Sequence, residues 1–286
     1  MTDTAVPGDA THLARAAAAD GVEVVVVCGG DGTLNEAANG LVGSETALAL
    51  IPGGTGNVWA REVGIATDPA GALGLLGAGR RVRVDTGVVQ IGNDPPRHFL
   101  LMCSAGVDAE AVRAVEQRPK LKRRLGRAAF GWPALRAIFA GSNETRLTVD
   151  GESCTVPLLM ALAGNTQLYA SVLRLTADAL MDDGQLDLLT FEDAPPGRLR
   201  VAMRRASILA RAVRSGLRDA STEGIRYTRI AHAELRPSGP LAVQADGEFI
   251  GIAGPDAPLQ LWVEPRSLTM LVPAGVNSLF SRNGDR

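Results

Sequence analysis

The chain has 286 residues, of which 46% are hydrophobic, and its formal net charge at pH 7 is −2. This length and apolar content are enough for one large domain or two ordinary domains with well-filled cores. The near-neutral charge excludes a nucleic-acid-binding protein that relies on an overall positive field, and an aromatic content of 4% argues against surfaces that stack bases. No apolar run approaches the roughly 20 residues of a membrane-spanning helix, so we expect no transmembrane segment.

The cysteines and the N-terminus indicate the cellular compartment. Cys28, Cys103 and Cys154 are far apart and odd in number, which favours free thiols over a disulfide framework. The first residues are polar and lack the positive and apolar regions of a signal peptide. We therefore expect a cytoplasmic protein.

Helices and strands are predicted to alternate in the first part of the chain. The β-branched run at residues 22–27 is typical of a strand buried on both faces of a parallel sheet. The predicted elements, in order, are a helix at 11–19, a strand at 22–27, a helix at 34–41, a strand at 48–51, and helices at 58–63 and 69–78. This order predicts a parallel α/β domain over residues 1–84.

Short strands are predicted to dominate from residue 81 onward, and the second domain is placed at residues 85–286. They are expected at 81–91, 98–103, 146–149, 153–158, 186–191, 225–235, 241–245, 259–263 and 268–272. Such a series with turn signals predicts an antiparallel β-sandwich. One or two helices are expected within 108–139 and one long helix at 198–217. The polar tail at 274–286 is expected to be loose.

Two glycine-rich turns each follow a predicted strand and precede a predicted helix. In the first, Gly29, Gly30 and Gly32 would let an anion approach the backbone N–H groups at the helix N-terminus. Thr33 can cap the helix or donate its hydroxyl to phosphate. Asp31 suits holding Mg²⁺ through water or accepting a proton from an alcohol. As an alternative, Asp31 is an ordinary helix cap.

The second turn has the sequence Gly53-Gly-Thr-Gly-Asn57. Thr55 offers a hydroxyl to phosphate or ribose, and Asn57 can cap the next helix or bridge the two turns. Two such turns close together suggest one shared anion site with a nucleotide as its occupant. The lysines are Lys120 and Lys122 alone, so a Walker-type phosphate lysine is excluded at both turns.

These turns, GGDGTLNEAANGL and IPGGTGNVWAREVGI, resemble the catalytic domain of the diacylglycerol kinase and sphingosine kinase superfamily, which includes soluble bacterial lipid kinases. Further similar segments follow in the order found in that superfamily, and the resemblance covers most of the chain. They are VDTGVV at 84–89, CSAGVDA at 103–109, the stretch from Gly164-Asn165 to Asp187, and QADGE at 244–248.

The resemblance implies an ATP- and Mg²⁺-dependent kinase acting on the hydroxyl of diacylglycerol or a related lipid. It implies an NAD kinase-like nucleotide-binding domain at 1–84 and a lipid-binding β-sandwich at 85–286. The residues implied to bind ATP are Gly29, Gly30, Asp31, Gly32, Thr33, Leu34, Asn35, Thr55, Gly56 and Asn57, with Asp31 in the Mg²⁺–ATP network. Glu248 is implied as the general base with Asp246 supporting it. Asp183, with the carbonyls of Leu180 and Gln185, is implied to hold a structural Mg²⁺.

The implied partners are a lipid at the inner membrane surface and a second copy of the chain. Basic stretches at 118–127 and 198–218 could contact anionic lipid or form solvated helix faces. The superfamily usually opens with a strand and an Asn-Pro loop that this chain lacks, so a truncated start or an incomplete nucleotide site is expected. Val58 also stands where an Asp is often present. The alternatives are therefore a sphingoid-base kinase, an NAD kinase-like enzyme, and a truncated, inactive relic that binds nucleotide or lipid.

Overall fold

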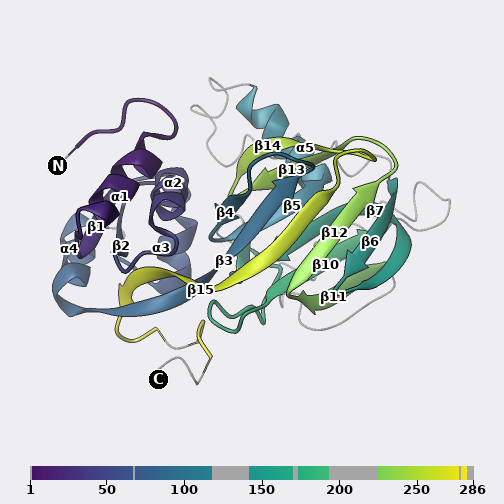
Figure 1. Ribbon diagram of the computed structural model, residues 1–286. Coiled ribbons are helices and arrows are strands. Elements are labelled where there is room, and N and C mark those ends of the chain that lie inside the picture. Colours follow the sequence, from purple (N-terminus) through teal and green to yellow (C-terminus); the bar gives the residue numbers. More distant parts are fainter. Residues whose placement is uncertain are drawn as a thin grey trace.

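The computed structural model describes residues 2–66, 68–117, 142–169, 173–192, 224–276 and 278–281. Figure 1 shows two lobes, a helix-rich N-terminal lobe and a strand-rich C-terminal lobe. Within the described residues, thirteen strands form one hydrogen-bonded sheet that runs through both lobes. The predicted combination of a parallel α/β domain and an antiparallel β domain is confirmed.

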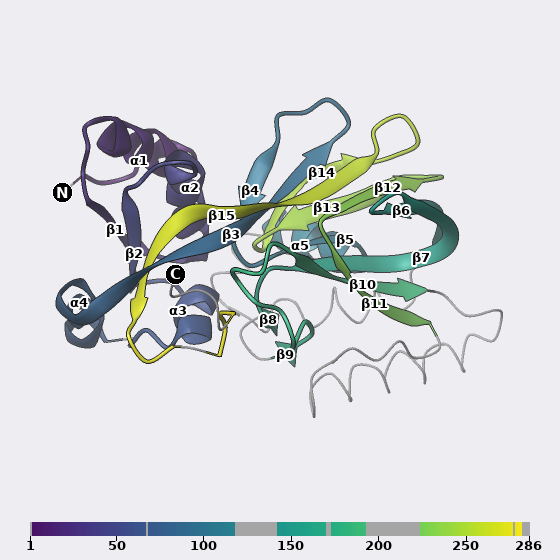
Figure 2. The same ribbon diagram turned by 60° about the horizontal axis from the view of Figure 1, so that its bottom comes forward.

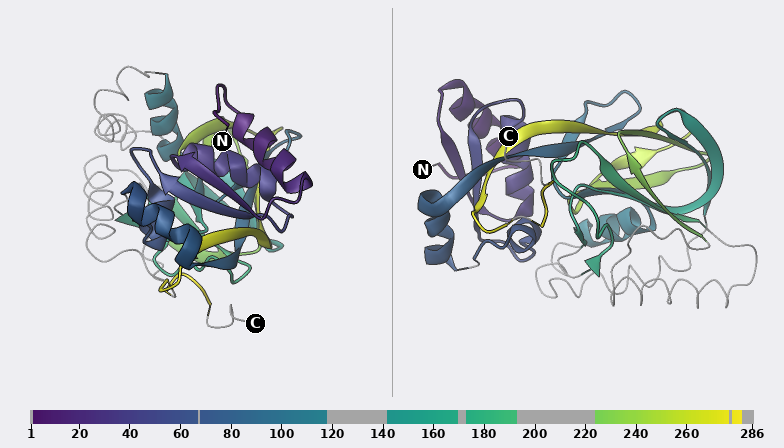
Figure 3. Two further views of the ribbon diagram at one scale, coloured as in Figure 1. Left: turned by 90° about the vertical axis from the view of Figure 1, so that its left-hand side faces the viewer. Right: turned by 90° about the horizontal axis from the view of Figure 1, so that it is seen from below.

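The N-terminal lobe has a short parallel sheet with helices on both faces (Figure 3). Its elements are α1 (Asp9–Ala19), β1 (Val24–Gly29), α2 (Asp31–Leu41), β2 (Ala47–Pro52), α3 (Val58–Val63) and α4 (Pro69–Ala78). The parallel register pairs Gly29 with Pro52, so both glycine turns start at the same edge of the sheet. Buried apolar residues recur every three or four positions on α2, which fixes the face that packs on the sheet.

Two long antiparallel strands connect the lobes, β3 (Gly79–Ile91) and β15 (Leu259–Pro273). Figure 2 shows them crossing from one lobe to the other. β15 also pairs in parallel with β2, through Met270 and Leu48, so the last strand returns to the N-terminal lobe. The sequence predicted separate strands at 259–263 and 268–272; they are one strand with an irregularity between Glu264 and Leu268. The predicted domain boundary at residues 84–85 falls inside β3.

The C-terminal lobe consists mainly of antiparallel strands. They are β4 (Arg97–Phe99), β5 (Met102–Gly106), β6 (Asn143–Val149), β7 (Glu152–Gly164), β8 (Leu168–Tyr169), β9 (Leu173–Arg174), β10 (Leu186–Glu192), β11 (Ile225–Ile230), β12 (His232–Pro237), β13 (Leu241–Ala245) and β14 (Glu248–Ala253). The helix α5 (Val107–Glu116) packs against β13, β14 and β5. β14 is a strand that the sequence did not predict, because it begins only three residues after β13 ends.

The tail differs from its expected loose state where it is described. Leu279 and Phe280 are buried, and the Arg80 guanidinium lies 5.1 Å from the Phe280 ring centroid. Ser281 donates to the Asp182 carboxylate through its backbone N at 2.6 Å and its hydroxyl at 3.0 Å. Apolar contacts and these bonds hold the segment, whose polar composition alone had suggested a loose end.

Several predicted segments lie outside the described residues. They are the continuation of the 108–139 helices beyond residue 117, the helix at 198–217, the basic stretches at 118–127 and 198–218, and the end of the tail. Among the helices that the structure does describe, none is both long enough and apolar enough to cross a membrane.

Candidate functional site

The two glycine turns are in direct backbone contact. Gly53 N donates to Gly29 O at 2.8 Å. A Cβ atom added to Gly54 would lie 2.7 Å from the Cα of Gly30, closer than real Cβ contacts come. No side chain caps the N-terminus of α2, where Gly30 is the N-cap. The N–H groups of the first turn of α2 are therefore oriented for an anion at the edge where the two turns meet.

Asp31 holds the second turn in place. Its two carboxylate oxygens accept from the backbone N–H groups of Val58 and Trp59, each at 3.0 Å. Asp31 therefore caps α3, the helix after the second turn, although it lies at the start of α2. Asn57 stays within its own turn, where its side-chain amide bonds Gly54 N at 2.9 Å and Gly54 O at 2.8 Å. The bridge between the turns that Asn57 could have made is made by Asp31.

The sequence Asp246-Gly-Glu248, which we call the DGE turn, joins β13 to β14. Both Asp246 and Gly247 have positive φ, 49° and 84°, as a tight turn requires. The Asp246 carboxylate accepts from the backbone N–H groups of three successive residues at 2.8–2.9 Å, those of Leu100, Leu101 and Met102. Removal from water raises the pKa of Asp246 to about 6, against the lowering effect of these bonds.

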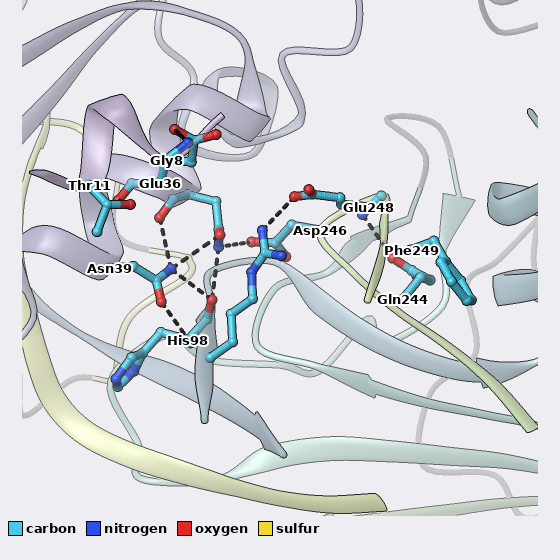
Figure 4. A network of polar contacts seen from close by, with 12 residues as sticks. Gly8, Thr11, Glu36, Asn39, His98, Gln244, Asp246, Glu248 and Phe249 are labelled. Atoms are coloured by element: carbon cyan, nitrogen blue, oxygen red, sulfur yellow. Dashed lines mark hydrogen bonds and ion pairs between the residues drawn. The ribbon is translucent and has the colours of Figure 1, made fainter. Parts of the chain in front are cut away.

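The helix α2 is bonded directly to the DGE turn. Asn35, which is buried, donates from Nδ2 to Asp246 Oδ2 at 2.7 Å and to His98 O at 3.1 Å. Asn39, one helical turn later, donates to His98 O and accepts from His98 N, each at 3.0 Å. Figure 4 shows this network between α2, β4 and the DGE turn. The structure therefore places the Asn35 amide on the side of α2 that faces the DGE turn.

Glu248 is more accessible than Asp246. It is the first residue of β14, and its side chain is 51% exposed. Its carboxylate forms an ion pair with Arg97. Of the two carboxylates implied to face an acceptor hydroxyl, Asp246 is committed to four hydrogen bonds, whereas Glu248 faces solvent. Glu248 is therefore the better placed of the two to exchange a proton.

A second polar network supports the DGE turn from the side of α5. Gly247 N donates to Gln244 Oε1 at 2.8 Å. Gln244 Nε2 donates to Ser104 Oγ at 2.8 Å and to Asp108 Oδ2 at 3.0 Å. The hydroxyls of Ser104 and Tyr169 also donate to the Asp108 carboxylate. Segments 103–109, 164–187 and 244–248 of the resemblance contain these residues, but no pattern in the sequence indicated that Gln244 and Tyr169 bond to Ser104 and Asp108.

Comparison with known proteins finds a matching family for each of the two lobes. Residues 1–89 match the family described as "Diacylglycerol kinase catalytic domain". Residues 102–272 match "YegS C-terminal NAD kinase beta sandwich-like domain". This chain belongs to the diacylglycerol kinase catalytic-domain family. The first match covers both glycine turns, and the second covers the S-x-G-x-D segment and the DGE turn.

Individual relatives support this membership. A protein named "Diacylglycerol kinase" from Mycobacterium tuberculosis (strain CDC 1551 / Oshkosh) is 30% identical over 277 residues, which is 93% of this chain and 82% of the relative. The Pseudomonas putida protein "Probable lipid kinase YegS-like" is 30% identical over 284 residues, covering 97% and 86%. A Staphylococcus carnosus "Diacylglycerol kinase" is 31% identical over 70% of this chain and 64% of its own length.

Solved structures agree with the fold. A diacylglycerol kinase from Bacillus anthracis str. Sterne superposes with a TM-score of 0.69 at 21% identity, covering 96% of this chain and 85% of that chain. At this identity the likeness concerns the fold alone.

The loop implied to hold a metal is rich in carboxylates. Asp183 Oδ1 accepts from Gln185 N at 3.1 Å, and Arg229 lies 3.9 Å from Oδ2. Burial and the neighbouring Asp182 raise the pKa of Asp183. Asp85 lies close by and accepts from Gly184 N at 2.7 Å, and burial raises its pKa as well. A cation would relieve this concentration of like charge.

The donor atoms of the loop suit Mg²⁺, because one carboxylate and the two backbone carbonyls of Leu180 and Gln185 are hard oxygen ligands. Within the described part of the chain, no three side chains of His, Cys, Asp or Glu are grouped to hold a metal ion. The implied set needs only one such side chain, Asp183, so it is compatible with that finding and stays a prediction.

Proposed function

We propose that the chain is an ATP- and Mg²⁺-dependent lipid kinase that phosphorylates the hydroxyl of diacylglycerol or a related lipid. The observation that carries the proposal is the 2.7 Å bond between Asn35 and Asp246. Asn35 lies on the helix that begins at the first glycine turn, and Asp246 belongs to the DGE turn. One helix thus connects the backbone that would hold phosphate with the carboxylates that would meet an alcohol. Phosphoryl transfer depends mainly on such positioning.

The glycine turns would hold the triphosphate of ATP. The N–H groups of the first turn of α2 would face the phosphates, and Thr33 and Thr55 would add hydroxyl donors. Asp31 would keep the second turn in register and act on the nucleotide's Mg²⁺ through water. The bound Mg²⁺ would supply neutralisation of phosphate charge during transfer.

Glu248 would act as the general base at the acceptor. The lipid hydroxyl oxygen forms a bond to the γ-phosphorus while the bond from that phosphorus to the β–γ bridging oxygen breaks. ADP leaves, and the hydroxyl proton passes to the Glu248 carboxylate. Asp246, fixed by its backbone donors, would hold the turn that carries Glu248.

The remaining elements of the proposal concern the C-terminal lobe. Asp183, with the carbonyls of Leu180 and Gln185, would hold a structural Mg²⁺ that braces the loop before β10. A lipid acceptor would place the protein peripherally at the inner membrane surface, facing the cytoplasm. We also propose a second copy of the chain as a partner. The mass of the protein in solution tests whether it forms such a dimer.

The test is a transfer assay on the purified full chain. Labelled ATP and Mg²⁺ are supplied with diacylglycerol, sphingosine or NAD, and we expect label on diacylglycerol. Transfer to sphingosine or to NAD instead would replace the proposed acceptor. Transfer to none of the three would favour an inactive nucleotide- or lipid-binding protein.

The role of Glu248 is tested by Glu248→Gln, which keeps the shape of the side chain but cannot accept the proton. We expect turnover to fall by about 10²–10⁴-fold, the usual contribution of a general base, with ATP affinity unchanged. Glu234→Gln is the matched control, because Glu234 pairs with Arg236 on β12, away from the DGE turn. Turnover retained in Glu248→Gln would refute the assignment of the base.

A further inference from the structure

The Glu248 carboxylate is held by a guanidinium that no motif indicated. Arg97 Nη2 lies 2.5 Å from Glu248 Oε2. The side chains are 32% and 51% exposed, so the pair is only partly removed from water. Arg97 is the first residue of β4 and precedes Glu248 by 151 residues in the sequence.

The backbone that carries Arg97 is fixed to the helix of the phosphate turn. Arg97 pairs with Val89 of β3 in the antiparallel register of β4. The next residue, His98, is bonded through its N and O to Asn35 and Asn39 of α2. The Arg97 side chain therefore starts from a point whose position is set relative to the first glycine turn.

The Glu248 backbone is fixed separately, from the side of α5. Phe249 N donates to Glu116 Oε1 at 3.2 Å, and the Arg113 guanidinium lies 5.4 Å from the Phe249 ring centroid. These contacts place the start of β14 but do not touch the Glu248 carboxylate. A glutamate side chain has three torsion angles, and fixing them costs conformational entropy. A partner that binds the carboxylate must offset this entropy cost. Among the contacts recorded for the described residues, Arg97 is that partner.

We propose that Arg97 is a positioning residue for the transfer reaction, which holds Glu248 so that its other oxygen, Oε1, faces the acceptor hydroxyl. The inference rests on the proposed function. Arg97 contacts Oε2, which leaves Oε1 to receive the hydroxyl proton. Arg97 itself exchanges no proton, because a guanidinium stays protonated in proteins. Its link through β4 to α2 aligns the base with the phosphates.

The exposure of the pair makes the inference testable without loss of the fold. Ion pairs that remain partly in water contribute little to stability. Replacing Arg97 should therefore leave the melting temperature nearly unchanged. A large loss of rate in a folded variant would then come from the position of Glu248.

The first experiment compares Arg97→Ala and Arg97→Lys with wild type, using diacylglycerol vesicles and saturating ATP. A misplacement of about 1 Å costs roughly 100-fold in rate, so we expect Arg97→Ala to lose about 100-fold in kcat with an unchanged KM for ATP. Arg97→Lys should recover part of the loss, and added guanidine should partly rescue Arg97→Ala. Arg236→Ala, which breaks the Arg236–Glu234 pair on β12, is the matched control and should retain wild-type kcat.

A double-mutant cycle with Glu248→Gln tests whether Arg97 acts through Glu248. If it does, Arg97→Ala causes no further loss in the Glu248→Gln background. Losses that multiply, or a wild-type kcat in Arg97→Ala, would overturn the inference while leaving the proposed function intact. Wild-type protein that phosphorylates no lipid would overturn the proposed function, and the inference with it. Should Arg97→Ala melt early, Arg97→Gln serves in the same cycle.

Discussion

Asn35 is the residue at which the two halves of the site are joined. Its amide nitrogen is shared between Asp246 Oδ2 and His98 O, while its Oδ1 accepts from Asn39 at 3.2 Å. Only a neutral amide offers both a donor and an acceptor in this shape. A resemblance to kinases predicts that Asn35 serves the nucleotide. The geometry indicates a second role, as the donor that lets a partly buried carboxylate remain ionised in the DGE turn.

Asn35→Asp is expected to destabilise the protein in a pH-dependent manner. It would place a second carboxylate within hydrogen-bond distance of Asp246, and two such groups cannot both be ionised. Loss of the donor and this repulsion should lower the free energy of unfolding by about 1–3 kcal/mol at pH 7.5. The deficit should shrink at pH 5, where one proton can bridge the pair.

Urea unfolding at the two pH values measures this effect. The matched control is Asn93→Asp, which adds the same charge in an exposed turn. We expect it to show neither the deficit nor the change with pH. An Asn35→Asp deficit that is equal at both pH values would show that repulsion by Asp246 is not its cause.

At the scale of elements, the two strand–turn–helix units work as one because their turns touch. Gly54 is in contact with the backbone of Gly30, and Asp31 caps the helix that follows the other turn. The proposed phosphate site is thus formed by both turns together. It follows that a change in the second turn will alter the first.

Gly54→Ala is expected to weaken ATP binding. The added Cβ would lie 2.7 Å from Gly30 Cα and 2.9 Å from Asn57 Oδ1, so backbone must move. Such overpacking costs about 1–3 kcal/mol, and we expect a similar loss of ATP binding energy, which is roughly 5- to 150-fold in affinity. Gly74→Ala in α4 is the control, because its Cβ would meet nothing within 4 Å. Calorimetric titration measures the affinity of each variant for ATP. A wild-type affinity in Gly54→Ala would contradict the expected coupling between the two glycine turns.

The strand–turn–helix units were predictable because their signals are local. A β-branched run, glycines and a periodic helix occur within about 20 residues of sequence, as at β1 and α2. The partners of the site residues were not predictable. Asn35 and Asp246 are 211 residues apart, and Arg97 and Glu248 are 151 apart. Such pairs depend on how β3 and β15 bring the lobes together, which short-range patterns do not encode.

Several strand boundaries and the buried part of the tail were also not predicted. β14 follows so closely on β13 that no separate apolar run marked it. The expected strand at 225–235 divides at Ala231 into β11 and β12, which pair with different neighbours. Leu279 and Phe280 are isolated apolar residues in a polar tail, and their burial depends on a surface built from distant parts of the chain.

At the scale of the whole molecule, most of the clearly shifted carboxylates in the part of the chain that the structure describes are shifted upward. Burial raises the pKa of Glu62, Asp85 and Asp183, and it raises those of Asp187 and Asp246 to about 6. These groups bind protons more tightly in the folded chain than in the unfolded chain, where an aspartate has a pKa of about 3.9. For Asp187 and Asp246 the contribution to stability is therefore complete only below about pH 4 and is lost as the pH rises through about 6. Glu62, Asp85 and Asp183 act in the same direction. His98 acts in the opposite direction, because burial lowers its pKa.

Asp187 isolates this effect, because its side chain is only 2% exposed. Its carboxylate accepts from the Tyr227 hydroxyl, and the Arg229 guanidinium is 3.7 Å away. Asp187→Asn cannot ionise but can still accept from Tyr227. At about 1.4 kcal/mol for each pKa unit, the shift to about 6 is worth about 3 kcal/mol in full, of which about 2 kcal/mol falls between pH 4.5 and pH 7.5. The free energy of unfolding of wild type should therefore fall by about 2 kcal/mol relative to Asp187→Asn over this range.

Urea unfolding of wild type and Asp187→Asn across this range measures the difference. Using the difference cancels the contributions of His98 and of the other carboxylates, which are common to both proteins. Asp256→Asn, in the exposed turn before β15, removes the same charge without a buried partner and should track wild type. The difference in free energy of unfolding between wild type and Asp187→Asn could instead stay constant from pH 4.5 to pH 7.5. Folding would then leave the proton affinity of Asp187 unchanged, because Tyr227 and Arg229 fully offset the removal of its carboxylate from water.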